Sequence, residues 1–241
     1  MRGMQIELRH APSFTVSRLV LAPEETVQVE NGAMMAHSDG IQISSKAAGG
    51  GIMKGLKRSV LSGESFFSTT FTAPAGGGWV DIAGVLPGDM TAIEIEPERP
   101  YFVARGNWMA NSEGTEVTSK FGGMKNLFGG EGGFGLQASG QGLVVLSVYG
   151  AIDTIDLQPG ERVVIDTGHV VAYDLAMQFT TRRAVSGRSF QSMKSGEGLV
   201  FEFTGPGRVY LQSRNPQSFA DWAAKLMPSS NAQGGLGGLF N

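Results

Sequence analysis

The chain has 241 residues, which is long enough to bury a sizeable hydrophobic core. It carries 36 glycines, roughly twice the usual share, and its formal net charge of −3 at pH 7 disfavours a general nucleic-acid-binding surface. Cysteine is absent, and this excludes disulfide bonds, a thiol nucleophile and thiolate metal ligands. The N-terminal ten residues lack the apolar core of a signal peptide, and no apolar run is long enough to span a bilayer, so we expect a cytoplasmic protein.

Short apolar and β-branched segments recur along the chain, and many of them alternate with polar residues. This period of two is typical of strands buried on one face. Turn-forming clusters rich in glycine, proline, asparagine and aspartate separate them. The predicted strands are Phe14–Val16, Thr26–Val29, Gly40–Ile43, Phe66–Thr72, Trp79–Ile82, Ala92–Ile95, Tyr101–Ala104, Leu143–Tyr149, Arg162–Ile165, Leu199–Phe203 and Arg208–Gln212. The sequence therefore predicts an all-β fold.

One helix is predicted near the C-terminus, over residues 216–227. Asn215 can cap it and Pro216 can occupy its first position. One apolar face is formed by Phe219, Trp222, Ala223 and Leu226, whose spacing matches the helical period, and this face is a further candidate contact surface if exposed. Residues 229–241 are rich in glycine and are expected to form a flexible tail.

An internal repeat is the strongest pattern in the sequence. Three segments align without gaps: Val27–Ile43, Tyr101–Val117 and Val163–Phe179. Each contains a strand, a glycine, two apolar residues, an alanine, a turn and a second strand. We predict a single domain, residues 1–228, of three tandem units (about 14–95, 96–157 and 158–214) that resemble β-sandwiches or double-stranded β-helices in a pseudo-threefold arrangement.

The repeated glycines are Gly32, Gly106 and Gly168. We expect each to take a positive φ at a hairpin or bulge, where a Cβ would clash. On that basis Gly106→Ala should cost on the order of 1 kcal/mol.

Each unit also contains a loop that begins at a basic residue and ends in Gly-Glu. The three glutamates are Glu64, Glu131 and Glu197. Either they gather around the pseudo-threefold axis as a cation-binding or subunit-contact ring, or each accepts hydrogen bonds from the backbone of its own loop; the second interpretation is preferred.

The same loops combine apolar residues with glycine and basic charge. The candidate contact residues are Met53, Lys54, Leu56, Lys57 and Arg58 in the first loop, Phe121, Met124, Lys125, Leu127 and Phe128 in the second, and Phe190 and Met193 in the third. Such segments can form a homo-oligomer interface, contact another protein or a membrane surface, or pack into the core.

Several of these features resemble one family. The stretch Gly49–Arg58, leading to Ser62–Phe67, and the Gly-Glu-Gly segments are similar to the altered-inheritance-of-mitochondria family, formerly a domain of unknown function, over about Ile6–Pro216. The resemblance implies an all-β fold of three repeats, each similar to a subunit of the tryptophan-binding RNA attenuation protein. It also implies a bacterial member without established activity, whereas mitochondrial members are associated with inner-membrane organisation and respiratory-chain assembly.

The histidines, serines and glycine-rich segments form no recognisable catalytic motif. The three histidines have no metal-ligand spacing, Ser62–Ser65 does not form a nucleophile elbow, and Gly49–Gly55 is not a phosphate-binding loop. We therefore expect no enzymatic activity, no metal and no cofactor. The preferred function is an oligomeric β scaffold or binding module, with a trimer weakly favoured and an unidentified protein partner. A peripheral membrane module, or a ring that binds RNA or a small molecule, is the alternative.

Overall fold

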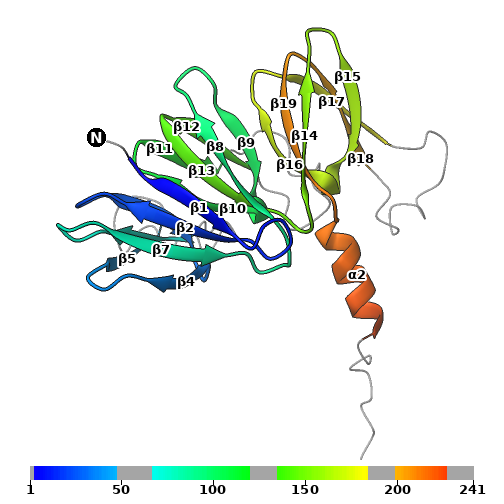
Figure 1. Cartoon of the computed structure of the whole chain (residues 1–241). Coiled ribbons are helices and arrows are strands. Elements are labelled where there is room, and N and C mark those ends of the chain that lie inside the picture. Colours follow the sequence, from blue (N-terminus) through cyan, green and yellow to red (C-terminus); the bar gives the residue numbers. More distant parts are fainter. Residues whose placement is uncertain (1–2, 48–66, 120–134, 184–198, 227–241) are drawn as a thin grey trace, which may run out of the picture.

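The computed structural model of the chain describes residues 3–47, 67–119, 135–183 and 199–226. These residues form β-strands, short 3₁₀ turns and one α-helix near the C-terminus (Figure 1). The prediction of an all-β fold with one short C-terminal helix is confirmed.

The strands are numbered in chain order. They are β1 (Gln5–Arg9), β2 (Val16–Leu21), β3 (Thr26–Glu30), β4 (Met34–His37), β5 (Gln42–Ala47), β6 (Phe67–Thr72), β7 (Gly78–Ala83), β8 (Met90–Ile95), β9 (Tyr101–Ala104), β10 (Trp108–Ser112), β11 (Thr115–Ser119), β12 (Gly135–Gly140), β13 (Gly142–Ser147), β14 (Ile152–Leu157), β15 (Arg162–Asp166), β16 (Val170–Asp174), β17 (Gln178–Arg183), β18 (Leu199–Thr204) and β19 (Gly207–Gln212). The turns η1 (Arg105–Asn107) and η3 (Thr167–His169) precede β10 and β16, and helix α2 covers Pro216–Leu226.

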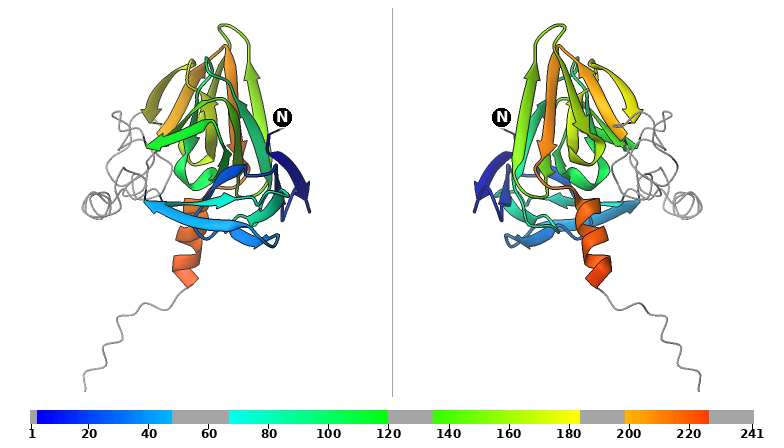
Figure 2. Two further views of the ribbon diagram at one scale, coloured as in Figure 1. Left: turned by 90° about the vertical axis from the view of Figure 1, so that its left-hand side faces the viewer. Right: turned by 90° about the vertical axis from the view of Figure 1, so that its right-hand side faces the viewer.

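The strands form four antiparallel sheets. A four-stranded sheet has the order β1-β2-β7-β4, and a three-stranded sheet has the order β15-β18-β17. Between them lie two six-stranded sheets, β5-β6-β3-β10-β13-β8 and β11-β12-β9-β16-β19-β14. Figure 1 and the side views in Figure 2 show the sheets arranged in succession from β4 to β15.

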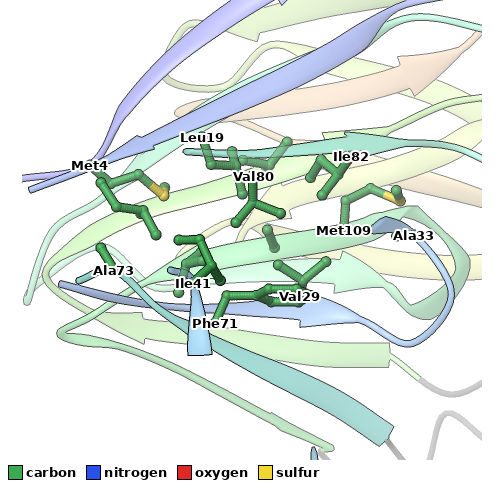
Figure 3. Packing of buried hydrophobic residues seen from close by; sticks show 14 of the residues in the cluster. Met4, Leu19, Val29, Ala33, Ile41, Phe71, Ala73, Val80, Ile82 and Met109 are labelled. Atoms are coloured by element: carbon green, nitrogen blue, oxygen red, sulfur yellow. The ribbon is translucent and has the colours of Figure 1, made fainter. Parts of the chain in front are cut away.

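The first hydrophobic core lies between the four-stranded sheet and the first six-stranded sheet. Leu19, Val80 and Ile82 enter it from one side, and Val29 and Phe71 from the other (Figure 3). All five side chains are almost completely buried. Since each large aliphatic or aromatic side chain contributes roughly 1.5–3 kcal/mol when it leaves water, this core holds the two sheets together.

Two further cores follow along the succession of sheets. The second joins the six-stranded sheets and includes Ile95, Val144 and Val103. The third lies against the three-stranded sheet and is aromatic, with Tyr173 and Phe203 ring centroids 5.0 Å apart. Every pair of neighbouring sheets therefore shares a buried interface.

The pairing of strands recurs in three consecutive groups of six: β2–β7, β8–β13 and β14–β19. In each group the first strand pairs with the sixth and the sixth with the third, while the second pairs with the fifth and the fifth with the fourth. The second and third groups repeat these pairs. The superposition of the groups about a pseudo-threefold axis stays a prediction.

The repeated glycines do not share one backbone conformation. Gly32, between β3 and β4, has a φ of +85°, as predicted. Gly106 and Gly168 lie within η1 and η3, outside the left-handed region, so the prediction of a positive φ is wrong for these two. The physical reason is that a 3₁₀ turn reverses the chain with ordinary negative φ angles. Gly106→Ala therefore lacks the strain expected of it, because a Cβ at this position would have no atom within 4 Å.

The C-terminal helix begins as the sequence predicts. The Asn215 side chain accepts hydrogen bonds from the backbone N–H groups of Gln217, at 2.9 Å, and of Ser218, at 3.4 Å. None of the residues of α2 is buried. Figure 2 shows the helix extending away from the sheets in both views.

Candidate interaction surface

The loop residues predicted to make contacts lie outside the described part of the chain. They belong to residues 48–66, 120–134 and 184–198, together with Glu64, Glu131 and Glu197. The three repeated glycines and the turns around them lie in the described part of the chain.

A buried polar network joins the corners at η1 and η3. Asn107 Nδ2 donates to the carbonyl of Ser147, at 2.8 Å, and to Gln212 Oε1, at 3.2 Å. Gln212 Nε2 in turn donates to the carbonyl of Gly168, at 3.0 Å. Asn107 and Gln212 are both buried, so these bonds satisfy groups that would otherwise be costly to remove from water. These hydrogen bonds therefore connect the second strand group (β8–β13) with the third (β14–β19).

A charge cluster holds the four-stranded sheet. The carboxylate of Asp81 on β7 accepts from Arg18 Nε at 2.8 Å and from Arg9 Nη2 at 2.6 Å, and its side chain is only 3% exposed. The Arg18 guanidinium also lies over the Trp79 ring, 3.8 Å from its centroid. The hydrogen bond from Arg18, assisted by that from Arg9, lowers the pKa of Asp81 below its usual value although burial opposes this.

Two further ion pairs follow the same pattern of a carboxylate held by arginine. Arg99 Nε donates to Asp174 Oδ2 at 2.7 Å, and Arg208 Nε donates to Asp156 Oδ1 at 2.5 Å. The bond from Arg208 lowers the pKa of Asp156. Burial raises the pKa of Tyr173, which is stacked on Phe102 in the third core. These groups stabilise the sheets, and among the described residues no cluster of three histidine, aspartate or glutamate side chains could hold a metal ion.

Each of the four sheets has two edge strands among the described residues, and two of these edges, at β4 and β15, differ from their counterparts in the other groups. β4 ends the four-stranded sheet beside β7, and β15 ends the three-stranded sheet beside β18. The corresponding third strands of the other groups, β10 and β16, lie inside six-stranded sheets and pair on both sides. Figure 1 places β4 and β15 at opposite ends of the molecule.

Apolar side chains are exposed on β4 at positions that are buried in the other groups. Met35 is 55% exposed, whereas its counterparts Met109 and Val171 are 2% and 0% exposed. All three residues sit at the same β-bulge, where the register shifts between Met34 and Ala36, Trp108 and Ala110, and Val170 and Ala172. The pairing with the sixth strand of each group is therefore equivalent, and the exposure of Met35 reflects the lack of a described strand on the other side of β4.

The sequence did not identify this edge, although it contained a signal for it. When three units are joined by pairing each to the next, the first unit and the last unit each keep one unmatched strand. The apolar residues Met34 and Met35, placed on such an end strand, are that signal.

A second exposed apolar surface lies on α2. Phe219, Trp222 and Leu226 are 39%, 57% and 66% exposed, and Phe219 contacts the Tyr149 ring at a centroid distance of 5.6 Å. The predicted apolar face is therefore present and reaches the body of the protein through one residue. Among the described residues, no helix has the length and hydrophobicity required to cross a membrane.

The fold defines the class: an all-β protein of stacked antiparallel sheets that presents the edges at β4 and β15 and one helix face to its surroundings. The family model described as Mitochondrial biogenesis AIM24 matches residues 6–214. The chain belongs to this family, as its resemblance predicted.

Two streptococcal proteins are similar to the chain over most of its length. An uncharacterized protein of Streptococcus pyogenes serotype M6 is 28% identical over 235 residues, which are 95% of this chain and 93% of that protein. The crystal structure of a Streptococcus pyogenes protein, solved by structural genomics, matches with a TM-score of 0.76 at 27% identity and covers 93% of this chain and 100% of the other. The fold described above is therefore shared with an experimentally determined structure.

Proposed function

We propose that the chain is a non-enzymatic cytoplasmic protein that self-associates into an oligomeric β-sheet scaffold or binding module. The observation that carries the proposal is the open, apolar edge at β4, where Met34 and Met35 are 40% and 55% exposed. Charged side chains, prolines and covering segments usually protect edge strands from pairing with other chains. β4 has the sequence Met-Met-Ala-His and carries neither lysine nor proline.

The use of the buried charges supports a structural role over a catalytic one. Asp81 and Asp174 are each held by arginine within hydrogen-bonding distance. The lowered pKa of Asp81 keeps its carboxylate ionised near neutral pH, so this group is a poor general acid. The buried side chains of Asn107 and Gln212 likewise form hydrogen bonds with other groups of the protein.

Light scattering coupled to size-exclusion chromatography tests the proposal on the full chain. We expect a molar mass above that of the 25.5 kDa monomer at tens of micromolar protein, and a further rise with concentration. A single monomeric species over that range would contradict it.

A membrane-surface role is the second candidate, and the exposed face of α2 favours it. Trp222 and Leu226 are the kind of side chains that enter the interfacial region of a bilayer, and Lys54, Lys57 and Arg58 supply basic charge in the sequence. Co-sedimentation with anionic vesicles should then fall when the three basic residues are changed to glutamate. An absence of binding by the unaltered chain would exclude this role.

A further inference from the structure

We propose that β4 of one chain pairs antiparallel with β15 of a second copy, so that the chains associate head to tail. Ala36 then lies opposite Ile165, His37 opposite Val164, and Ser38 opposite Val163. The inference rests on the self-association proposed above and specifies which surfaces perform it.

The pairing follows from a junction that the chain makes twice within itself. β10, the third strand of the second group, pairs with β3, the second strand of the first group. β16, the third strand of the third group, pairs in the same way with β9 of the second group. The rule is that the third strand of a group pairs with the second strand of the group before it. No group precedes the first, so β4 has no such partner, and no group follows the third, so β15 has none.

The register is fixed by the same two junctions. Ala110 lies opposite Val29 in one and Ala172 opposite Val103 in the other. Counted from the repeated glycines, Ala36 corresponds to these alanines, and Ile165 corresponds to the two valines. A strand shifted by one residue would turn its apolar side chains to the opposite face, so this register is the one that keeps the repeated packing.

The numbers of strands in the four sheets support the junction. Each six-stranded sheet consists of three strands from one group and three from the next. The end sheets are the two unjoined halves: β15-β18-β17 on one side and β4-β7-β2, extended by β1, on the other. Pairing β4 of one copy with β15 of another joins these two halves into a sheet that is built like the two six-stranded sheets.

The counterparts of Met35 show where its exposed side chain would be buried in the proposed pairing. Met109, the counterpart of Met35, enters the first core among residues of the preceding strand group, as Figure 3 shows. Val171 enters the second core in the same manner. In the proposed dimer, Met35 covers the third core of the other chain beside Ile165, and this removes its side chain from water.

Charge does not oppose this contact. Asp81 is paired to Ala36 across β7 and β4, in the position that Val145 and Tyr210 occupy opposite Ala110 and Ala172. Because its carboxylate is already held by Arg9 and Arg18, covering this position leaves no unpaired carboxylate.

The junction has a direction, so it is heterologous. The two surfaces differ, and each chain still has one free edge after a first contact is made. Through this junction the chains form closed rings or open filaments, and they do not form a symmetric dimer through two β4 strands.

Cysteine cross-linking tests the register, because the natural chain contains no cysteine. His37→Cys and Val164→Cys are made as separate single variants of the full chain and mixed under oxidising conditions. Directly opposite Cβ atoms in an antiparallel pair are roughly 4.5–5.5 Å apart, within reach of a disulfide or a short bismaleimide. Asp153→Cys, an exposed position on the edge strand β14, is the matched control partner for His37→Cys.

We expect a covalent dimer from the mixture of His37→Cys with Val164→Cys, and none above background from the control mixture or from either variant alone. Dimers of one variant with itself, or an equal yield with Asp153→Cys, would each overturn the proposal. A third chain that carries both His37→Cys and Val164→Cys should form no disulfide within one monomer, and such a disulfide would also overturn it.

A variant that needs no cross-link provides a second test. Val164→Lys places a charge in the centre of the junction and should weaken self-association about tenfold or more, because the ammonium must lose water without a partner. Val85→Lys makes the same chemical change at a loop residue that is 97% exposed and should leave the association unchanged. Equal association of the two variants would contradict the junction.

The outcomes separate this inference from the proposed function. A monomeric unaltered chain would reject both. An oligomer that forms no link between positions 37 and 164 would reject only the β4–β15 junction.

Discussion

The substitution Asp81→Asn tests the charge cluster that holds the four-stranded sheet. The carboxylate is 3% exposed and accepts three hydrogen bonds from two arginines, at 2.6, 2.8 and 2.9 Å. Breaking a fully buried pair costs about 3–5 kcal/mol. The Arg9 and Arg18 side chains are 38% and 27% exposed, so they can turn toward water, and we expect a smaller loss of about 2 kcal/mol.

The effect should depend on pH in a defined direction. Because the pKa of Asp81 is lowered in the folded protein, its contribution to stability is present above the unfolded value of about 3.9. That contribution is lost as the pH falls through the folded pKa. The difference in stability between the unaltered chain and Asp81→Asn is therefore largest near neutral pH and shrinks below about pH 4.

Thermal unfolding followed by circular dichroism measures both effects. A loss of about 2 kcal/mol corresponds to a fall in Tm of roughly 4–8 °C for a chain of this size. Glu113→Gln, at an exposed turn, removes a carboxylate without this environment and should leave the Tm nearly unchanged. An unaltered Tm for Asp81→Asn near pH 7, or a Tm difference that persists undiminished near pH 3, would refute the reasoning.

Three further predictions concern the corners and the core, and urea unfolding measures each as a free energy. Gly32→Ala should lower the free energy of unfolding by about 1–2 kcal/mol because Gly32 has a φ of +85°. Gly106→Ala, in a 3₁₀ turn, should change it by less than about 0.5 kcal/mol. Equal losses for the two variants would contradict the difference in backbone conformation between these turns. Asn107→Ala should cost about 1–3 kcal/mol by removing a donor to Gln212, and a neutral result would show that the network adds nothing. Phe201→Ala should cost about 3–5 kcal/mol, and a loss below about 1 kcal/mol would show that the third core is loosely packed.

The sequence predicts strands well where hydrophobic alternation is strong. Leu199–Phe203 and Arg208–Gln212 match β18 and β19 closely because their inward residues are apolar and their flanks carry turn residues. β12 was missed, since its sequence Gly-Leu-Gln-Ala-Ser-Gly contains weak strand formers. Pairing with β9 and β11 on both sides compensates for this low propensity.

Among the other strands that were missed, β14 and β1 illustrate two different reasons. β14 reads Ile-Asp-Thr-Ile-Asp-Leu, where aspartates interrupt the alternation on an exposed sheet edge. β1 is mostly exposed and is held by β2 and by the ion pair from Arg9 to Asp81. Local pattern does not contain these long-range partners, so neither strand could be read from its own residues.

The candidate surface was predicted only in part. The exposed face of α2 followed from the spacing of Phe219 and Trp222, because a helical period identifies one face without knowledge of the fold. The open edges at β4 and β15 depend on which strand pairs with which, and this is a property of the tertiary structure. Met35 and Met109 occupy equivalent positions of the repeat, and β3 pairs with the strand of Met109 while no described strand pairs with that side of β4.

Hydrogen exchange measured by mass spectrometry at increasing protein concentration tests self-association through these edges most directly. Amide groups at an unpaired edge exchange quickly, and pairing with a second chain protects them. We predict that protection rises with concentration in the segments that contain β4 and β15, while the segments that contain β10 and β16 remain protected throughout. Exchange at β4 and β15 that is independent of concentration, in a sample whose mass shows self-association, would contradict the pairing of chains at these edges.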